Sequence, residues 1–312
     1  METVGLKRAR IGRVRLRAQR TLASKLVDAV RLAILYLVVT AGAFTMLLPF
    51  YWMATTGIKV DREILTYPPT WIPTALDFSH WQKAISSGNF GRAFINSGVL
   101  AISSVVTNVG LAALTGYAFA RLKFPGSGVL FVLVLATMMV PYQVTVIPLF
   151  VMIKNVPLFG GNDLLGAGGI GWMDSWWGLI VPNAVGAFGI FMMRQFFLVL
   201  PPELEDAARI DGAGEFRIFW QVMLPLTWPA LATLGLFSFQ GGWNSFYWPL
   251  LITTSREMLT LQLALRVFRT QFTTDWGALM AGATIATLPI IIVFLLGQRY
   301  FTRGIAMTGI KG

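Results

Sequence analysis

Six stretches of the chain contain no Asp, Glu, Lys or Arg and are mostly apolar. They cover residues 32–58, 93–120, 124–153, 175–193, 218–255 and 276–298. A helix that crosses the hydrocarbon core of a bilayer needs about 20 mostly apolar residues, and each stretch reaches or approaches that length. The pattern therefore predicts six membrane-spanning helices, at 32–54, 94–119, 129–151, 175–194, 227–250 and 277–298.

The stretch at 218–255 is longer than one span needs, and Leu224-Pro225 divides it. Proline has no backbone N–H, so we expect one helix to end near this dipeptide and the next to begin after it. Other helix-interrupting residues lie in or near the apolar stretches: Pro141, Pro148, Pro182, Pro289, Gly110, Gly116, Gly186, Gly189 and Gly282. The predicted fold is all-α, a polytopic membrane bundle of six transmembrane helices in which small residues permit close packing.

The composition excludes a soluble enzyme. Of the 312 residues, 55% are hydrophobic and 12% are charged, whereas a typical soluble domain has about 25% charged residues. Cysteine is absent, which removes disulfides, a thiolate nucleophile and Cys-ligated metals. No predicted span contains a carboxylate, and we expect the single histidine, His80, to be an exposed loop residue. We therefore predict no catalytic residue, no metal site and no enzyme activity.

The positive charges indicate the orientation. Seventeen of the 25 Lys and Arg residues fall in 1–31, 120–128, 194–226 and 299–312, which lie on one side of the membrane if the six spans are correct. Lys and Arg are concentrated in the cytoplasmic segments of membrane proteins. We therefore predict a multi-pass protein of the cell membrane with both termini in the cytoplasm.

Residues 1–31 are strongly basic between Lys7 and Lys25. A basic segment beside a span can contact anionic lipid headgroups, so we interpret it as an orientation anchor. Two alternatives are a cleaved signal peptide, suggested by the small residues Ala41-Gly42-Ala43, and nucleic-acid binding. Because the apolar run continues to Met53, we expect an uncleaved span, membrane lipid as the partner and no nucleic acid.

A transporter built from this chain would need its energy from elsewhere. Proton- and ion-coupled carriers usually have charged residues in their core, and the interiors of the predicted spans have none. A Walker A loop requires a Gly-Lys dipeptide, which the sequence lacks. One G-x-G-x-x-G match, from Gly166 to Gly171, lies in a Gly-rich segment before a predicted span, so we interpret it as flexible loop and not as a dinucleotide site.

The loop between the fourth and fifth spans, residues 201–226, has the most distinctive pattern. Five of the 14 acidic residues lie between Glu203 and Glu215. Pro201-Pro202 suits a helix start, and acids in the first turn complement the helix dipole. Gly212 then permits a turn with positive φ.

Two faces of this loop have a helical period. Leu204, Ala207, Ala208 and Asp211 share a face of the first short helix, and Phe216, Phe219, Trp220 and Met223 form an apolar stripe on a second one. The residues alone leave two interpretations open: a helical hairpin that docks a partner, and an interfacial hairpin packed on the bilayer.

The run from Asp206 to Ala213 (Asp-Ala-Ala-Arg-Ile-Asp-Gly-Ala), followed by Leu224-Pro225, resembles the EAA loop of ABC-importer permeases. The similarity extends from about Pro49 to Gly312 and includes 49–59, 194–197, 243–250 and 309–312. It is greatest to the smaller, six-span permease of maltose-type carbohydrate importers. The family's leading Glu is Asp206 here, which keeps the charge on a shorter side chain.

The resemblance implies a type I importer permease architecture. A basic segment at 1–31 and a first helix at 32–54 would precede a transmembrane domain at 92–298 with five helices, and a tail at 299–312 would follow. The expected partners are a second homologous permease, a dimeric ATPase and an extracytoplasmic solute-binding protein. ATP and Mg²⁺ would be used by the ATPase, and this chain would bind no cofactor.

In the family, the EAA loop forms coupling helices that insert into a cleft on the ATPase. This implies that the ATPase-coupling residues are Glu203, Glu205, Asp206, Ala207, Ala208, Arg209, Asp211, Gly212 and Ala213. Closure of the ATPase on ATP would move these helices and switch the bundle from inward-open to outward-open.

Sugar sites combine aromatic faces with amides that bind hydroxyl groups. Candidates for the substrate pathway are Asn183, Gln240, Trp243, Asn244 and Phe246. The expected function is import of a sugar or oligosaccharide. The alternatives are import of a non-sugar solute, such as a phosphorylated polyol, and a stand-alone channel or carrier.

Overall fold

The structure is a computed structural model that describes residues 22–270 and 272–308, with side chains described for 26–270 and 272–299. Most of the predicted basic segment at 1–31 and residues 309–312 of the predicted tail lie outside the described residues. The contacts divide the chain into two compact units, Met1–Trp52 and Met53–Gly312. Each unit is described by itself.

The regular elements of the described part are helices, and extended pairing there is limited to the single bridges Lys59–Leu76 and Arg269–Thr274. The helices are α2 (Leu22–Thr56), α3 (Asp61–Ile64), α4 (Ser79–Ser86), α5 (Phe90–Arg121), α6 (Ser127–Thr137), α7 (Tyr142–Lys154), α8 (Trp176–Ile180), η1 (Val181–Asn183), α9 (Ala187–Val199), α10 (Glu203–Ile210), α11 (Glu215–Arg217), η2 (Ile218–Met223), α12 (Leu224–Leu226), α13 (Trp228–Trp243), α14 (Tyr247–Ile252), α15 (Leu261–Ala264), η3 (Leu265–Phe268) and α16 (Trp276–Thr308).

The first unit contains most of α2. Its side chains are exposed throughout 26–51, and an 18-residue window within Leu26–Thr56 has a mean hydropathy of 2.1. A long apolar helix exposed on all sides suits a lipid environment, and α2 matches the span predicted at 32–54. Pro49 lies inside α2 without ending it, which membrane helices tolerate.

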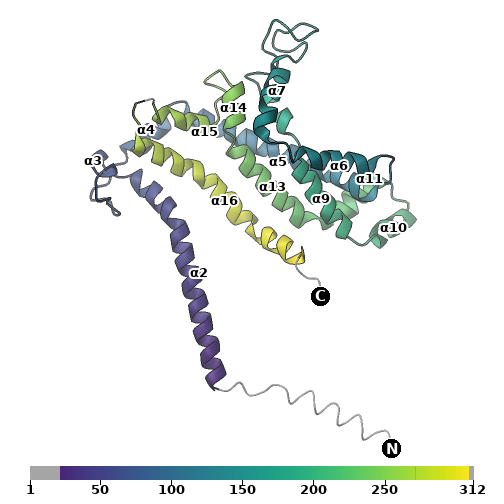
Figure 1. The fold of residues 1–312 in the computed structure, drawn as a ribbon, viewed down its shortest axis with the longest axis horizontal. Coiled ribbons are helices and arrows are strands. Elements are labelled where there is room, and N and C mark those ends of the chain that lie inside the picture. Colours follow the sequence, from purple (N-terminus) through teal and green to yellow (C-terminus); the bar gives the residue numbers. More distant parts are fainter. Residues whose placement is uncertain (1–21, 271, 309–312) are drawn as a thin grey trace, which may run out of the picture. The chain divides into compact units, whose positions relative to one another are not determined.

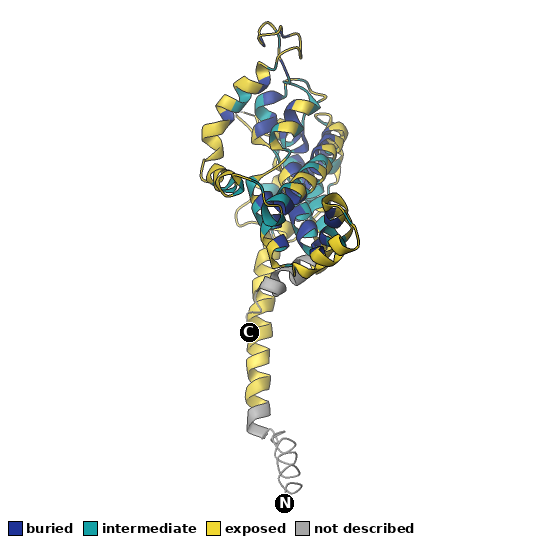
Figure 2. Cartoon of the chain, turned by 90° about the vertical axis from the view of Figure 1, so that its right-hand side faces the viewer, coloured by how far each residue is buried: buried dark blue, intermediate teal, exposed yellow. Residues whose placement is uncertain are grey.

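The core of the second unit is built around α5. This helix packs along both α9 and α13, and α16 packs on the other side of α13 (Figure 1). Buried residues gather where these helices meet (Figure 2). The largest cluster lies at one end of the bundle, where the rings of Tyr117, Phe197 and Phe219 contact one another.

Glycines set the closest helix approaches. A Cβ on Gly116 of α5 would lie 2.7 Å from the Cβ of Met193 on α9, and a Cβ on Gly242 of α13 would lie 2.7 Å from the Cα of Ala101 on α5. Only a residue without a side chain fits such contacts. The close packing predicted from the small residues is therefore present at these positions.

Three pairs of helices are bent at a short break. The bend is 102° between α6 and α7, 44° between the Trp176–Asn183 segment and α9, and 80° at Thr227, between the Glu215–Leu226 and Trp228–Ile252 segments. With the long apolar helices α2, α5 and α16, the described residues contain up to six spans if each bent pair crosses once. The predicted number of six agrees with this arrangement.

The break before α13 lies two residues after the predicted Leu224-Pro225 boundary. Pro225 belongs to α12, and the helical path continues to Leu226. At Thr227 the side-chain hydroxyl donates to the carbonyl of Leu224, 2.9 Å away. Pro229, in the first turn of α13, has no N–H to continue the hydrogen-bond ladder, so the chain bends here rather than at Pro225.

Candidate functional site

The 201–226 segment forms the predicted helical hairpin. Glu203, Glu205 and Asp206 occupy the first turn of α10, directly after Pro202. Gly212 ends the helix with a φ of 79°. The N–H of Ala213 donates to the carbonyl of Ala208 at 2.9 Å, and that of Gly212 to the carbonyl of Arg209 at 3.0 Å. This is the glycine-terminated Schellman cap, so the predicted helix and its turn are confirmed.

The nine predicted coupling residues divide by exposure. Glu205 is only 4% exposed, and Ala208 and Ala213 are half-buried against the cluster around Tyr117. The remaining six are exposed: Glu203, Asp206, Ala207, Arg209, Asp211 and Gly212. The neighbouring acids Glu205 and Asp206 thus have different surroundings, because successive residues of a helix point in directions about 100° apart.

Arg209 holds the two helices of the hairpin together. Its guanidinium lies 3.1 Å from an oxygen of Asp206 and donates to Glu215 at 3.0 Å. That hydrogen bond lowers the pKa of Glu215 from its ordinary value. The hydroxyl of Tyr117, on α5, also donates to Glu215, at 3.2 Å. The turn at Gly212 is therefore fixed from both sides by charged hydrogen bonds.

The sequence analysis missed Arg121, the last residue of α5. Its guanidinium donates to the carbonyls of Phe197 and Leu200, where α9 ends, and its Nε lies 3.5 Å from an oxygen of Glu205. In the sequence Arg121 counted only as one of the positive charges that indicate orientation. The one sequence signal for Arg121 is that it is a positive charge directly after a long apolar stretch.

The predicted apolar stripe of the second helix is present, and its three rings lie next to one another, but only part of it is buried. Phe219 and Met223 are buried, but Phe216 is 73% and Trp220 59% exposed, and their rings stack 6.5 Å apart. Ile218 is fully buried in their place. Ile218–Met223 is a π-helix, whose period differs from the 3.6 residues of an α-helix, and Ile218 joins its buried side.

A cavity of about 640 Å³ lies in the middle of the bundle, between α5, α9 and α13 and the segments around α8 and α14. Three of the predicted substrate residues line it: Asn183, Asn244 and Phe246. Gln240 and Trp243 are not among its lining residues. Trp243 is 2% exposed, donates its indole N–H to the carbonyl of Ala286 and packs in the core.

The cavity also contains a residue that the sequence analysis did not select. Asn108 of α5 accepts from the N–H of Gly186 at 3.0 Å and donates to the hydroxyl of Ser238 at 2.9 Å. It thereby connects α5 to α13 and to the break before α9. A single amide inside an apolar run gives no sequence signal for such a contact, because its partners are distant along the chain. Tyr142 and Tyr247 add two rings, 6.2 Å apart.

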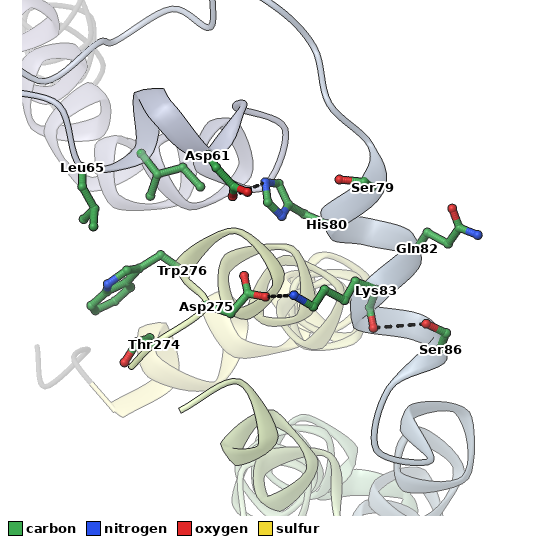
Figure 3. A pocket seen from close by; sticks show the side chains of 11 residues that line it. Asp61, Leu65, Ser79, His80, Gln82, Lys83, Ser86, Thr274, Asp275 and Trp276 are labelled. Atoms are coloured by element: carbon green, nitrogen blue, oxygen red, sulfur yellow. Dashed lines mark hydrogen bonds and ion pairs between the residues drawn. The ribbon is translucent and has the colours of Figure 1, made fainter. Parts of the chain in front are cut away.

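A second pocket, of about 610 Å³, lies between α3, α4 and the start of α16 (Figure 3). The prediction that His80 is exposed is wrong: it is 5% exposed, and its Nε2 lies 3.0 Å from the carbonyl of Lys59. Gly277 contacts the imidazole ring so closely that a Cβ there would lie 2.4 Å from it. Figure 3 shows His80 facing Asp61, and Lys83 facing Asp275. Within 22–270 and 272–308, no group of three or more His, Asp or Glu residues could hold a metal ion.

The Gly-rich segment at 166–171 lies in a loop, as predicted, and hydrogen bonds hold that loop together. The side chain of Asn162 donates to the carbonyls of Lys154 and Val156 and accepts from the N–H of Gly169. Gly160 and Gly169 approach opposing backbone atoms too closely for any Cβ. The glycines therefore serve a hydrogen-bonded loop between α7 and α8, and neither neighbouring element is a strand.

The comparisons with known proteins agree with this architecture. Residues 108–307 match the family model described as "Binding-protein-dependent transport system inner membrane component". The chain is 34% identical over 269 residues to the arabinooligosaccharides transport system permease protein AraQ of Bacillus subtilis, covering 85% of this chain and 91% of the relative. It is 33% identical over 278 residues to the sn-glycerol-3-phosphate transport system permease protein UgpE of Yersinia pestis, covering 86% and 94%.

A solved structure has the same fold. It is the crystal structure of a bacterial ABC transporter involved in the import of the acidic polysaccharide alginate, with a TM-score of 0.72 and 23% identity, covering 91% of this chain and 98% of that chain. The matched family model covers most of the bundle and the whole 201–226 hairpin. Together with relatives above 30% identity over more than four fifths of the chain, the match assigns the protein: it is a membrane permease of the family of inner-membrane components of binding-protein-dependent ABC transport systems.

Proposed function

We propose that this chain is one of two permease subunits of an importer for a neutral sugar or oligosaccharide. An extracytoplasmic binding protein delivers the substrate, and a separate ATPase dimer on the cytoplasmic side supplies the energy. The chain itself has no catalytic role. A relative named for arabinooligosaccharide transport supports the carbohydrate class.

The observation that carries the proposal is the exposed acidic face of α10. Glu203, Asp206 and Asp211 present carboxylates outward, while the caps at Pro202 and Gly212 hold the helix as a rigid unit. A short rigid helix attached at both ends can transmit the closure of a partner as a displacement. The small exposed residue Ala207 permits close contact with the partner's cleft. ATP binding then biases the bundle between two states.

The cavity in the bundle supports a neutral substrate. Its lining provides the amides of Asn108, Asn183 and Asn244 and the rings of Tyr142 and Phe246, which suit hydroxyl groups and the apolar faces of sugar rings. The lining residues, all in the described part of the chain, include no Lys or Arg. An anionic solute such as a phosphorylated polyol would find no countercharge in this half of the pathway. Because the relative UgpE is named for sn-glycerol-3-phosphate transport, a phosphorylated polyol is the second candidate substrate.

The coupling role is tested by Asp211→Lys in the complete importer, reconstituted in proteoliposomes. We expect ATP hydrolysis to continue while uptake falls at least tenfold, because the reversed charge repels the partner's cleft. Asp61→Lys is the matched control, since Asp61 is also exposed but lies on α3, far along the chain from the hairpin. Normal uptake by Asp211→Lys at normal abundance would refute the coupling assignment.

The substrate class is tested by comparing ATP-dependent uptake of a neutral oligosaccharide and a phosphorylated polyol. We expect uptake of the oligosaccharide, and a change in sugar preference on Asn244→Ala. Gln82→Ala, which removes an exposed amide on α4, should leave the preference unchanged. Uptake of the phosphorylated polyol alone would favour the second candidate.

A further inference from the structure

Glu205 is the one acid in the first turn of α10 whose side chain points into the protein. Its side chain is 5% exposed, compared with 69% for that of Asp206. A buried carboxylate is costly unless a positive charge compensates it. Two guanidinium groups do so: Arg121 lies 3.5 Å from one carboxylate oxygen and Arg209 lies 3.6 Å from the other. The side chain of Glu205 is therefore not available to a partner's surface, whereas that of Asp206 is exposed.

Arg121 connects Glu205 to two transmembrane helices at once. It is the last residue of α5, its side chain is 10% exposed, and it donates to the carbonyls of Phe197 and Leu200. These carbonyls lie at the C-terminal end of α9, where the regular hydrogen-bond ladder of the helix ends; that of Phe197 also accepts from the N–H of Leu200 at 3.3 Å. In the opposite direction, Arg194 of α9 donates to the carbonyl of Phe119 on α5 at 3.2 Å. The ends of α5 and α9 are thus bound together, and Glu205 attaches α10 to that junction.

Glu205 and Arg121 could form a hydrogen bond that they do not form in this structure. The Nε of Arg121 and the Oε1 of Glu205 are both buried and form no hydrogen bond to another protein group, although they are 3.5 Å apart. A charge-assisted hydrogen bond between such groups is about 2.7–2.9 Å long. A displacement of α10 by less than 1 Å would therefore convert the ion pair into a hydrogen bond.

We propose that the Glu205–Arg121 pair is the joint through which movement of α10 reaches α5 and α9. Glu205 is then a positioning residue and not a contact of the ATPase, in contrast to Asp206 beside it. The inference rests on the proposed function, because it requires a partner that moves α10. The link from Tyr117 to Glu215 is a second contact between α5 and the hairpin, but it holds the other helix.

The test uses Glu205→Gln in the complete importer in proteoliposomes, with ATP hydrolysis and sugar uptake measured in the same sample. Glutamine keeps the size of the side chain and removes its charge. We expect the ATPase to remain bound and ATP to be hydrolysed, while the sugar transported per ATP falls at least tenfold and the loaded binding protein no longer stimulates hydrolysis. Asp206→Asn is the comparison variant, for which we expect weaker retention of the ATPase during purification.

Two results would overturn the joint: unchanged transport per ATP in Glu205→Gln, or loss of the ATPase to the same extent as in Asp206→Asn. If Glu205→Gln does not accumulate in the membrane, Glu205→Asp replaces it. Aspartate keeps the charge and lengthens the contact by about one methylene, so the joint requires a lower transport per ATP at normal abundance. A wild-type importer without ATP-dependent sugar uptake would instead refute the proposed function, so the two failures are distinguishable.

Discussion

Gly212 gives the 201–226 hairpin its turn, because α10 ends there with a φ of 79°. We predict that Gly212→Ala destabilises the turn by about 1–2 kcal/mol, since an L-residue is strained in the left-handed region. Gly214 is the matched control: its φ is −75°, and an added Cβ at either glycine meets no atom within 4 Å. Transport per ATP should fall for Gly212→Ala and stay unchanged for Gly214→Ala. Equal effects of the two variants would show that backbone strain is not the cause.

Asp275 caps α16 and pairs with α4. Its carboxylate accepts from the N–H of Ala278 at 3.0 Å and from Lys83. We predict that Asp275→Ala costs about 1 kcal/mol, the usual loss for an N-cap. Asp275→Asn should cost less, because the amide oxygen can still accept from Ala278. Thermal unfolding in detergent at pH 7 measures both variants, and a larger loss for Asn than for Ala would contradict the cap.

The same carboxylate makes this contribution depend on pH. Burial acts to raise the pKa of Asp275, but the hydrogen bonds from Lys83 and Ala278 outweigh it, and the pKa is lowered on balance. A lowered pKa in the folded state gives stability that is fully present above the unfolded value of about 3.9 and is lost as the pH falls through the folded value. The difference in Tm between wild type and Asp275→Asn should therefore be constant from pH 7 to pH 5 and shrink below about pH 4. A difference that grew on acidification would contradict the assignment.

Individual side chains were predicted less well than the segments that hold them. Glu205 and Asp206 were assigned one role, yet one is buried and one exposed. Which side of the short helix α10 is buried depends on Arg121, which lies in the segment 120–128, outside the predicted spans. The burial of His80 was missed because the groups that enclose it, the carbonyl of Lys59 and the backbone of Gly277, come from other parts of the chain.

At the scale of elements, close packing of α5 against α9 depends on Gly116. We predict that Gly116→Ala destabilises the bundle by about 1–3 kcal/mol, because the added methyl group overlaps Met193 and the backbone at Arg194. Gly98→Ala on the same helix is the control, since a Cβ there meets no atom within 4 Å. The measurement is thermal unfolding of both variants in the assembled importer. A Tm of Gly116→Ala at or above that of Gly98→Ala would contradict the close contact.

The helices themselves followed from the apolar runs, and α10 from its prolines, first-turn acids and glycine. The breaks were harder to place. Both Pro141 and Pro225 lie in apolar stretches, but Pro141 lies in the break between α6 and α7, whereas Pro225 lies within α12 and the bend follows at Thr227. The π-helix at Ile218–Met223 could not be read from a 3.6-residue period, so the burial of Ile218 was not predicted.

For the whole molecule, the predicted orientation places the 201–226 hairpin in the cytoplasm and the loop at 155–175 outside. The chain has no native cysteine, so single cysteines report their own accessibility. We predict that a membrane-impermeant maleimide labels Leu165→Cys in right-side-out vesicles and labels Asp211→Cys only after the membrane is opened. Leu165 is 90% exposed, which makes it a sensitive position. Labelling of Asp211→Cys in sealed vesicles would reverse the orientation.

The most direct test asks whether this chain forms a transport pathway but cannot itself supply the energy for transport. The chain alone, the ATPase alone and the complete importer with its binding protein are each reconstituted in proteoliposomes, and sugar uptake and ATP hydrolysis are measured in parallel. We predict that the chain alone gives neither uptake nor hydrolysis, and that only the complete importer accumulates sugar when ATP is present. Uptake or ATP hydrolysis by the chain alone would contradict the account.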